Sequence, residues 1–109
     1  MIDIETFDSI DIRVGTVVAV DINKRARKPA YKVDIDFGSE LGIKTTSAQI
    51  TDLYTPETLI GMKVVCCVNL PPMRIGSVKS EVRILGADNA KGCVLLTPSL
   101  PAENGEKIF

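Results

Sequence analysis

The chain has 109 residues, of which 45% are hydrophobic and 25% are charged, so residues 1–109 are expected to form one domain with one core. Its formal net charge of −1 argues against a surface coated with basic residues, although a local basic patch can lie within a balanced total. No apolar run is long enough to cross a bilayer, and the acidic start MIDIETFDSIDIRVG is unlike a secretory signal. We therefore predict a cytoplasmic protein without membrane insertion.

The residue types that most often carry catalysis are scarce. The chain has no histidine, so neither a Ser/His or Cys/His pair nor a histidine-based zinc site can form. Cys66 and Cys67 are adjacent and lack the gap of a metal-binding or redox pair, and with Cys93 they make an odd number that suits reduced, buried thiols. A carboxylate or lysine enzyme stays open as an alternative, but the composition favours a binding protein without metal or cofactor.

The predicted elements, taken in chain order, begin with a bent strand at residues 12–20. Its apolar side chains alternate loosely and are expected to share one inward face: Ile12, Val14, Val18 and Val20. Gly15, in the middle of this strand, allows a bulge or a sharp bend. The next strand, residues 31–37, alternates cleanly between apolar and charged residues, so one face is expected in the core and the other in water.

The middle of the chain predicts two more strands around a short helix. Residues 43–50 are rich in β-branched residues, which favour a third strand. Thr55 as N-cap and Pro56 at the first helical position predict a helix over residues 56–60. The apolar run at residues 62–68 is typical of a strand that is buried on both faces.

Two further strands are predicted at residues 78–85 and 92–97, and the chain then ends in a turn-rich segment. Three strands, a short helix and two or three more strands are the order of a five-stranded OB-fold barrel, in which the helix lies between strands 3 and 4. We therefore predict an all-β OB-fold with small terminal additions. A small β-sandwich is the alternative, and the short helix and the few strands make it less suitable.

The basic residues concentrate in two predicted connections. OB-folds bind oligonucleotides on the face of strands 2 and 3, between the loops that join strands 1 to 2 and 4 to 5. Those loops and the start of the second strand hold seven of the thirteen basic residues: Lys24, Arg25, Arg27, Lys28, Lys32, Arg74 and Lys79. We predict a binding patch at one end of the barrel. The alternative is that a charge run such as KRARK is only a solvated loop.

Aromatic side chains are too few in this patch to stack single-stranded bases. Phe7, Phe37, Phe109 and Tyr31 are expected to pack, which leaves mainly Tyr54. A rigid, folded RNA that is recognised by its shape and its phosphates is therefore the better nucleic-acid candidate.

Both ends of the chain carry apolar residues. Ile4, Phe7 and Ile10 recur every three residues and share one side of a helical turn, and the chain finishes in Ile108 and Phe109. These side chains are expected either to plug the ends of the barrel in a monomer or to form the interface of a homodimer.

Several segments, in one order, give the chain a family resemblance that covers nearly its whole length. The chain resembles the tRNA-binding domain in DIRVGTV, YKVDIDFG, TTSAQIT, YTPETLIGMKVVCCVNLPP and SEVRILG. That domain is an OB-fold found attached to some aminoacyl-tRNA synthetases and in small stand-alone dimers, so the resemblance favours the homodimer. The segments TTSAQIT, NLPP and SEVRILG are most similar to small export-related chaperones within the family.

The resemblance implies a homodimeric chaperone for unfolded secretory precursor polypeptides, with the export machinery as a further partner. The alternative is a protein that binds folded tRNA through its basic patch. Family tRNA contacts correspond here to five positions: Lys32, Asn69, Arg74, Lys79 and Ser80. Glu81 departs from the glycine that many tRNA-binding members carry after this serine, and its negative charge lowers the expected affinity for tRNA.

Overall fold

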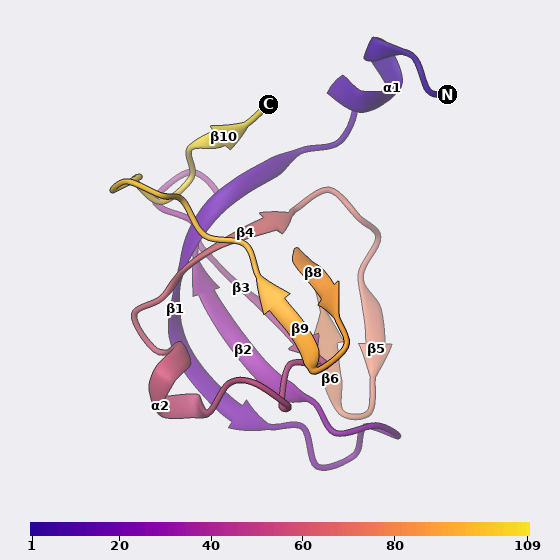
Figure 1. Cartoon of the computed structure of the whole chain (residues 1–109), viewed down its shortest axis with the longest axis vertical. Helices are drawn as coiled ribbons and strands as arrows, with labels where there is room; N and C mark the ends of the chain where they lie inside the picture. Colours follow the sequence, from indigo (N-terminus) through magenta and orange to yellow (C-terminus); the bar gives the residue numbers. More distant parts are fainter.

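The computed structural model describes all 109 residues and confirms the all-β barrel (Figure 1). Five strands follow one another in the main sheet in the order β3-β2-β1-β4-β7, and β10 adds to β1. The bounds of these strands are β1 Ile12–Ile22, β2 Tyr31–Asp36, β3 Ile43–Ala48, β4 Lys63–Cys67, β7 Arg83–Ile84 and β10 Lys107–Ile108. The short helix α2 (Pro56–Leu59) lies between β3 and β4 with Thr55 as its N-cap, which confirms its predicted place.

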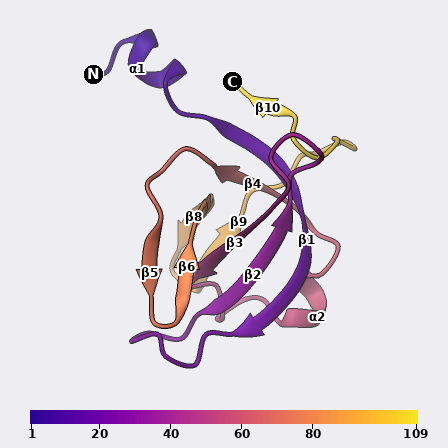
Figure 2. The same ribbon diagram turned by 180° about the vertical axis from the view of Figure 1, so that it is seen from behind.

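Two small hairpins lie outside the main sheet (Figure 2). Their strands are β5 Met73–Ile75, β6 Val78–Ser80, β8 Gly86–Asn89 and β9 Gly92–Leu95, paired as β5–β6 and β8–β9. The prediction of one strand over residues 78–85 is wrong, because the chain leaves β6 after Ser80 and joins β4 only later, as β7. The connection before it is not a simple loop, since it contains the β5–β6 hairpin.

The core lies inside the barrel and follows the clean alternation of β2. The side chains that point inward are fully buried: Val33, Ile35 and Phe37. Lys32, which precedes Val33 and points to the opposite face, is exposed. They pack with Leu59 of α2 and with the apolar residues of β4. Burying each side chain of this kind contributes about 1.5–3 kcal/mol to the stability of the fold. The predicted inward face of the second strand is therefore confirmed by its burial, and it forms the centre of the core.

The predicted inward face of the first strand is wrong at Val18, which is 43% exposed. Val17 is buried instead, and Val20 packs against the core as predicted, because the pairing of β1 with β2 shifts register between Val17 and Ala19. A shift of one residue turns the following side chains to the opposite face. Gly15 has a different role, since a Cβ there would lie 2.5 Å from a side-chain carbon of Ile35. Close packing across the barrel therefore requires this glycine.

Side chains close the barrel between β3 and the segment after β6. The Thr45 N–H donates to the Glu81 carboxylate at 2.9 Å, and the Glu81 N–H donates to the Thr45 carbonyl at 2.8 Å. Two residues further along β3, the Ser47 N–H donates to the Ser80 hydroxyl at 3.1 Å. The hairpin is thus held to the outer edge of β3 without a regular ladder between the two strands.

The two termini lie near each other at one end of the barrel, and the loop between β1 and β2 lies at the other end (Figures 1 and 2). The N-terminal segment forms α1 (Ile4–Asp8), whose first turn is capped by the Asp3 side chain, and every residue of α1 is exposed. The C-terminal segment is held by Arg13, which donates to the Gly105 carbonyl at 3.1 Å and to Glu40 at 2.9 Å. Neither helix has the length and apolar composition needed to cross a membrane.

Candidate binding site

Two hollows lie next to each other along the β5–β6 hairpin. The apolar groove has a volume of about 600 Å³ and is lined by residues 46–50, 70–73, 75, 80–84 and 93. The basic pocket has a volume of about 460 Å³ and is lined by residues 25–28, 30, 47, 49 and 74–76. Both are concave sites of the size that ordinarily holds part of a ligand.

One wall of the apolar groove is the continuation of β3. The Ser47 N–H on this edge is occupied by the Ser80 hydroxyl, but the backbone N–H and carbonyl of Gln49, the next residue on the same edge, make no hydrogen bond. Gln49 is exposed. An unpaired strand edge is the part of a sheet to which an extended polypeptide can add through its own backbone.

The opposite wall of the groove carries exposed apolar side chains. Leu70 is 46% exposed and Met73 is 65% exposed, and Pro71 and Pro72 lie between them. Prolines have no N–H to offer, so this wall can contact a ligand mainly through apolar surface. The groove therefore combines backbone pairing on one side with apolar contact on the other, which suits an extended chain that exposes apolar side chains.

The basic pocket brings together cations from two distant segments. Arg25, Arg27 and Lys28 come from the loop between β1 and β2, and Arg74 comes from β5. All four are exposed, and no acidic residue lines the pocket. Four cations without a lining carboxylate give a site for an anion such as a phosphate. These four of the predicted cations therefore surround one pocket, beside the loop between β1 and β2, which lies at the lower end of the molecule in Figure 1.

Asn23 and Gly76 hold these segments in contact. The amide of the buried Asn23 donates to the Ser47 hydroxyl at 3.0 Å and to the Ile75 carbonyl at 2.9 Å. Gly76 has a φ of +61°, and a Cβ there would lie 2.7 Å from the carbonyl carbon of Arg25. The loop, β3 and the hairpin therefore form one connected wall. Sequence reasoning missed Asn23, because a single Asn at a strand end carries no local sign of its distant partners.

Lys79 and Lys32 lie beside this pocket without lining it. Lys79 is directly opposite Arg74 in the β5–β6 hairpin, and Lys32 is directly opposite Ser47 in the β2–β3 ladder. Like charges that face each other across a hairpin are destabilising, so the pair of Arg74 and Lys79 favours a bound anion. The sequence prediction joined these residues, and the structure places them around the same hollow.

The remaining face of β2 and β3 is acidic. Beyond Lys32, the outward residues of β2 are Asp34 and Asp36, and Asp34 accepts a hydrogen bond from the Thr45 hydroxyl at 2.7 Å. This is the face that OB-folds commonly use for oligonucleotides. Positive charge is therefore confined to the end of the face that is next to the basic pocket.

Three residues named in the sequence analysis do not line the basic pocket: Asn69, Ser80 and Glu81. The Ser80 hydroxyl bonds to β3 and lines the apolar groove, as does Glu81, whose carboxylate accepts the Thr45 N–H. Asn69 accepts from the Asp11 N–H at 3.0 Å and donates to the Ser9 carbonyl at 2.8 Å, so its amide joins β4 to the N-terminal segment. These side chains already have protein partners, and neither Asn69 nor Glu81 lines the basic pocket.

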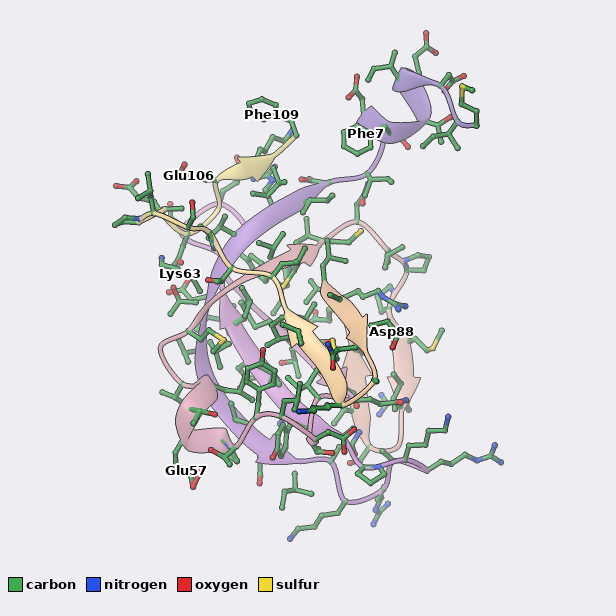
Figure 3. All side chains as sticks on the ribbon, in the orientation of Figure 1. Phe7, Glu57, Lys63, Asp88, Glu106 and Phe109 are labelled. Carbon is green, nitrogen blue, oxygen red and sulfur yellow. The ribbon has the colours of Figure 1, made fainter.

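The apolar residues of the termini are all exposed in the single chain. The exposed fractions are 70% for Ile4, 39% for Phe7, 41% for Ile10, 39% for Ile108 and 101% for Phe109. Phe7 and Phe109 lie at the same end of the molecule (Figure 3). They do not plug the barrel in the single chain, so the plugged-monomer alternative is wrong and the homodimer interface stays a prediction. We call these five residues the terminal cluster.

Comparison with known proteins agrees with this description. A family model described as "Putative tRNA binding domain" matches residues 12–107. The chain is 35% identical to a methionine–tRNA ligase of Pyrococcus furiosus over 98% of its own length and 14% of that enzyme. It is 37% identical to the methionine–tRNA ligase of Methanocella arvoryzae, again over 98% of the chain and 15% of that enzyme. The chain thus spans about a seventh of these curated relatives.

Solved structures match the whole chain. The chaperone CsaA of Bacillus anthracis is 48% identical with a TM-score of 0.93, covering 100% of this chain and 99% of that one. The CsaA chaperone protein of Picrophilus torridus is 47% identical with a TM-score of 0.96, covering 100% of both chains. The predicted resemblance is therefore confirmed: the chain belongs to the putative tRNA-binding domain family and is close to CsaA within it.

Proposed function

We propose that the protein is a homodimeric, cytoplasmic chaperone that binds unfolded precursor polypeptides during export and acts by binding, without catalysis. The observation that carries the proposal is the apolar groove, which has unpaired backbone groups at Gln49, directly after β3, and exposed apolar side chains at Leu70 and Met73. The likeness to chaperones along the whole chain supports it. The export machinery is a further proposed partner.

The groove suits the chemistry of an unfolded precursor. Such a chain exposes apolar side chains and unpaired backbone groups, which together make it prone to aggregate. One stretch of it can pair with the backbone of Gln49 while its apolar side chains contact Leu70 and Met73. Arg74 and Lys79 do not line the groove, but they belong to the hairpin whose Met73 and Ile75 do, and they can bind acidic groups where the stretch leaves the groove. Covering these groups lowers the concentration of aggregation-prone segments.

Substitutions in the exposed wall of the groove test this proposal. Leu70→Ser combined with Met73→Ser should weaken binding of an unfolded precursor about tenfold or more, since 1.4 kcal/mol corresponds to a factor of ten and each change removes exposed apolar contact area. Binding is measured by fluorescence anisotropy of a labelled, unfolded precursor, together with light scattering of its aggregation. Leu100→Ser, at a residue that is 77% exposed and outside the groove, is the control. Unchanged binding by the double variant would overturn the assignment.

A second candidate function is binding of folded tRNA at the basic pocket. The observation in its favour is the group of four cations without a lining carboxylate. If roughly three to five phosphates are neutralised, the logarithm of affinity should fall against the logarithm of salt concentration with a slope of about −2 to −4. The measurement is a filter-binding titration of folded tRNA at several salt concentrations. A flat salt response would exclude this mode of binding.

A further inference from the structure

The apolar groove and the basic pocket share one wall. Ser47, Gln49 and Ile75 line both hollows. Of the three, Gln49 is exposed, and its backbone N–H and carbonyl make no hydrogen bond within the chain. The same residue therefore borders a surface suited to polypeptide and a surface suited to phosphate.

The shared wall is thin compared with a folded RNA. It consists of three residues, Ser47 and Gln49 at the end of β3 and Ile75 of β5, and neighbouring strands in a sheet lie only about 4.8 Å apart. An RNA helix held by phosphate contacts is far wider than this spacing, because its two backbones flank a wide, shallow minor groove. An RNA whose backbone rests on Arg25, Arg27 and Arg74 must therefore extend over the mouth of the neighbouring groove.

The hollows cannot move apart to accommodate both ligands. The Asn23 amide bonds to the Ser47 hydroxyl and to the Ile75 carbonyl, so it ties the basic loop to two of the three shared residues. Gly76 fits against the backbone of Arg25 with no room for a side chain. Separating the hairpin from the basic loop would break both hydrogen bonds of the Asn23 amide and the close packing of Gly76 against the loop, which is costly.

We infer that folded RNA and unfolded polypeptide exclude each other at this site, so that RNA bound over the basic pocket releases polypeptide from the apolar groove. The inference rests on the proposed function, since it takes the groove as the polypeptide site. Exclusion follows from the bulk of the RNA. A small anion such as pyrophosphate can occupy the basic pocket without covering the groove, and it leaves the polypeptide bound.

The test is displacement of a labelled, unfolded precursor from the full chain. With folded tRNA at ten times its own Kd, the apparent Kd of the precursor should rise about tenfold, as competitive linkage requires. Pyrophosphate at the same constant ionic strength should leave this Kd unchanged. Arg25→Glu combined with Arg27→Glu should abolish the effect of tRNA. The control, Lys91→Glu combined with Lys107→Glu, makes the same change of charge outside both hollows and should keep the displacement.

The fold-change is taken within each variant, so an altered affinity for the precursor itself cancels. If the precursor binds and saturating tRNA leaves its Kd unchanged, the inference is wrong while the proposed function stands. The inference is equally wrong if tRNA does not bind, or if pyrophosphate displaces the precursor as strongly as tRNA does. Failure of the precursor to bind without any RNA would overturn the proposed function and the inference together.

Discussion

Burial determines the chemistry of the cysteines. Cys66 is fully buried in the core, where burial and the adjacent Cys67 raise the pKa of its thiol to about 12. Cys93 is half-buried in the wall of the groove. The interpretation of the cysteines as unpaired thiols that act as small hydrophobic residues is therefore confirmed for Cys66 and Cys67.

This pKa predicts a loss of stability in alkali. Above 9.0 the thiol ionises in the unfolded chain, whereas in the folded chain it stays protonated up to about 12. The unfolded state then binds fewer protons, so this thiol lowers the free energy of unfolding by up to about 1.4 kcal/mol per pH unit as the pH rises through this window. Urea unfolding between pH 8.5 and 11 measures the slope. Cys66→Val should flatten it, and equal slopes for the two proteins would contradict the prediction.

Individual elements depend on side chains to close the barrel. The edge of β3 is not paired in a ladder with the segment after β6, and the contacts there are bonds such as that from the Thr45 N–H to the Glu81 carboxylate. Sequence reasoning treated Glu81 as a charge beside a phosphate. Its carboxylate instead replaces the acceptor that a neighbouring strand would supply.

Removing that acceptor should destabilise the fold. Glu81→Ala leaves the half-buried Thr45 N–H without a partner and should lower the free energy of unfolding by about 1–3 kcal/mol. Glu81→Gln removes the same charge but keeps an oxygen that can accept the hydrogen bond, so it should lower the free energy of unfolding clearly less than Glu81→Ala does. Urea unfolding of both variants measures the difference. Equal losses would show that the charge, and not the hydrogen bond, matters at this position.

The molecule as a whole has two different ends. The terminal cluster lies at one end of the barrel and the basic loop at the other (Figures 1 and 2), along a longest dimension of 38 Å. The groove runs between them. Its wall includes Leu70, next to the Asn69 amide that bonds the N-terminal segment, and Ile75, which also lines the basic pocket. Exposed apolar residues gathered in this way are typical of an interaction surface.

The proposed homodimer predicts that substitutions in the terminal cluster halve the mass of the protein in solution. The unsubstituted protein should sediment at twice the 11.8 kDa of one chain, and Phe7→Asp combined with Phe109→Asp should sediment as a monomer, since a charge buried in an apolar interface is costly. Both residues are exposed in the single chain, so the variant should remain folded. Leu100→Asp is the control outside the terminal cluster. An unsubstituted protein that sediments at 11.8 kDa would rule out this dimer.

The sequence by itself determined the features that depend on local periodicity. The alternation of residues 31–37, the N-cap at Thr55 and the order of the strands predicted the inward face of β2, the place of α2 and the barrel, because each follows from neighbours along the chain. The concentration of basic charge was also predictable, since two connections of an OB-fold meet at one end of its barrel.

Only the tertiary structure decided where the hollows lie. The register shift in β1, the hairpin inside residues 69–82 and the bonds of Asn23 depend on contacts between residues far apart in sequence, and local propensity does not encode such contacts. The same is true of Ser80 and Glu81, whose side chains are bound to β3. Packing of the hairpin against the edge of β3 and the basic loop therefore separated one predicted patch into an apolar groove and a basic pocket.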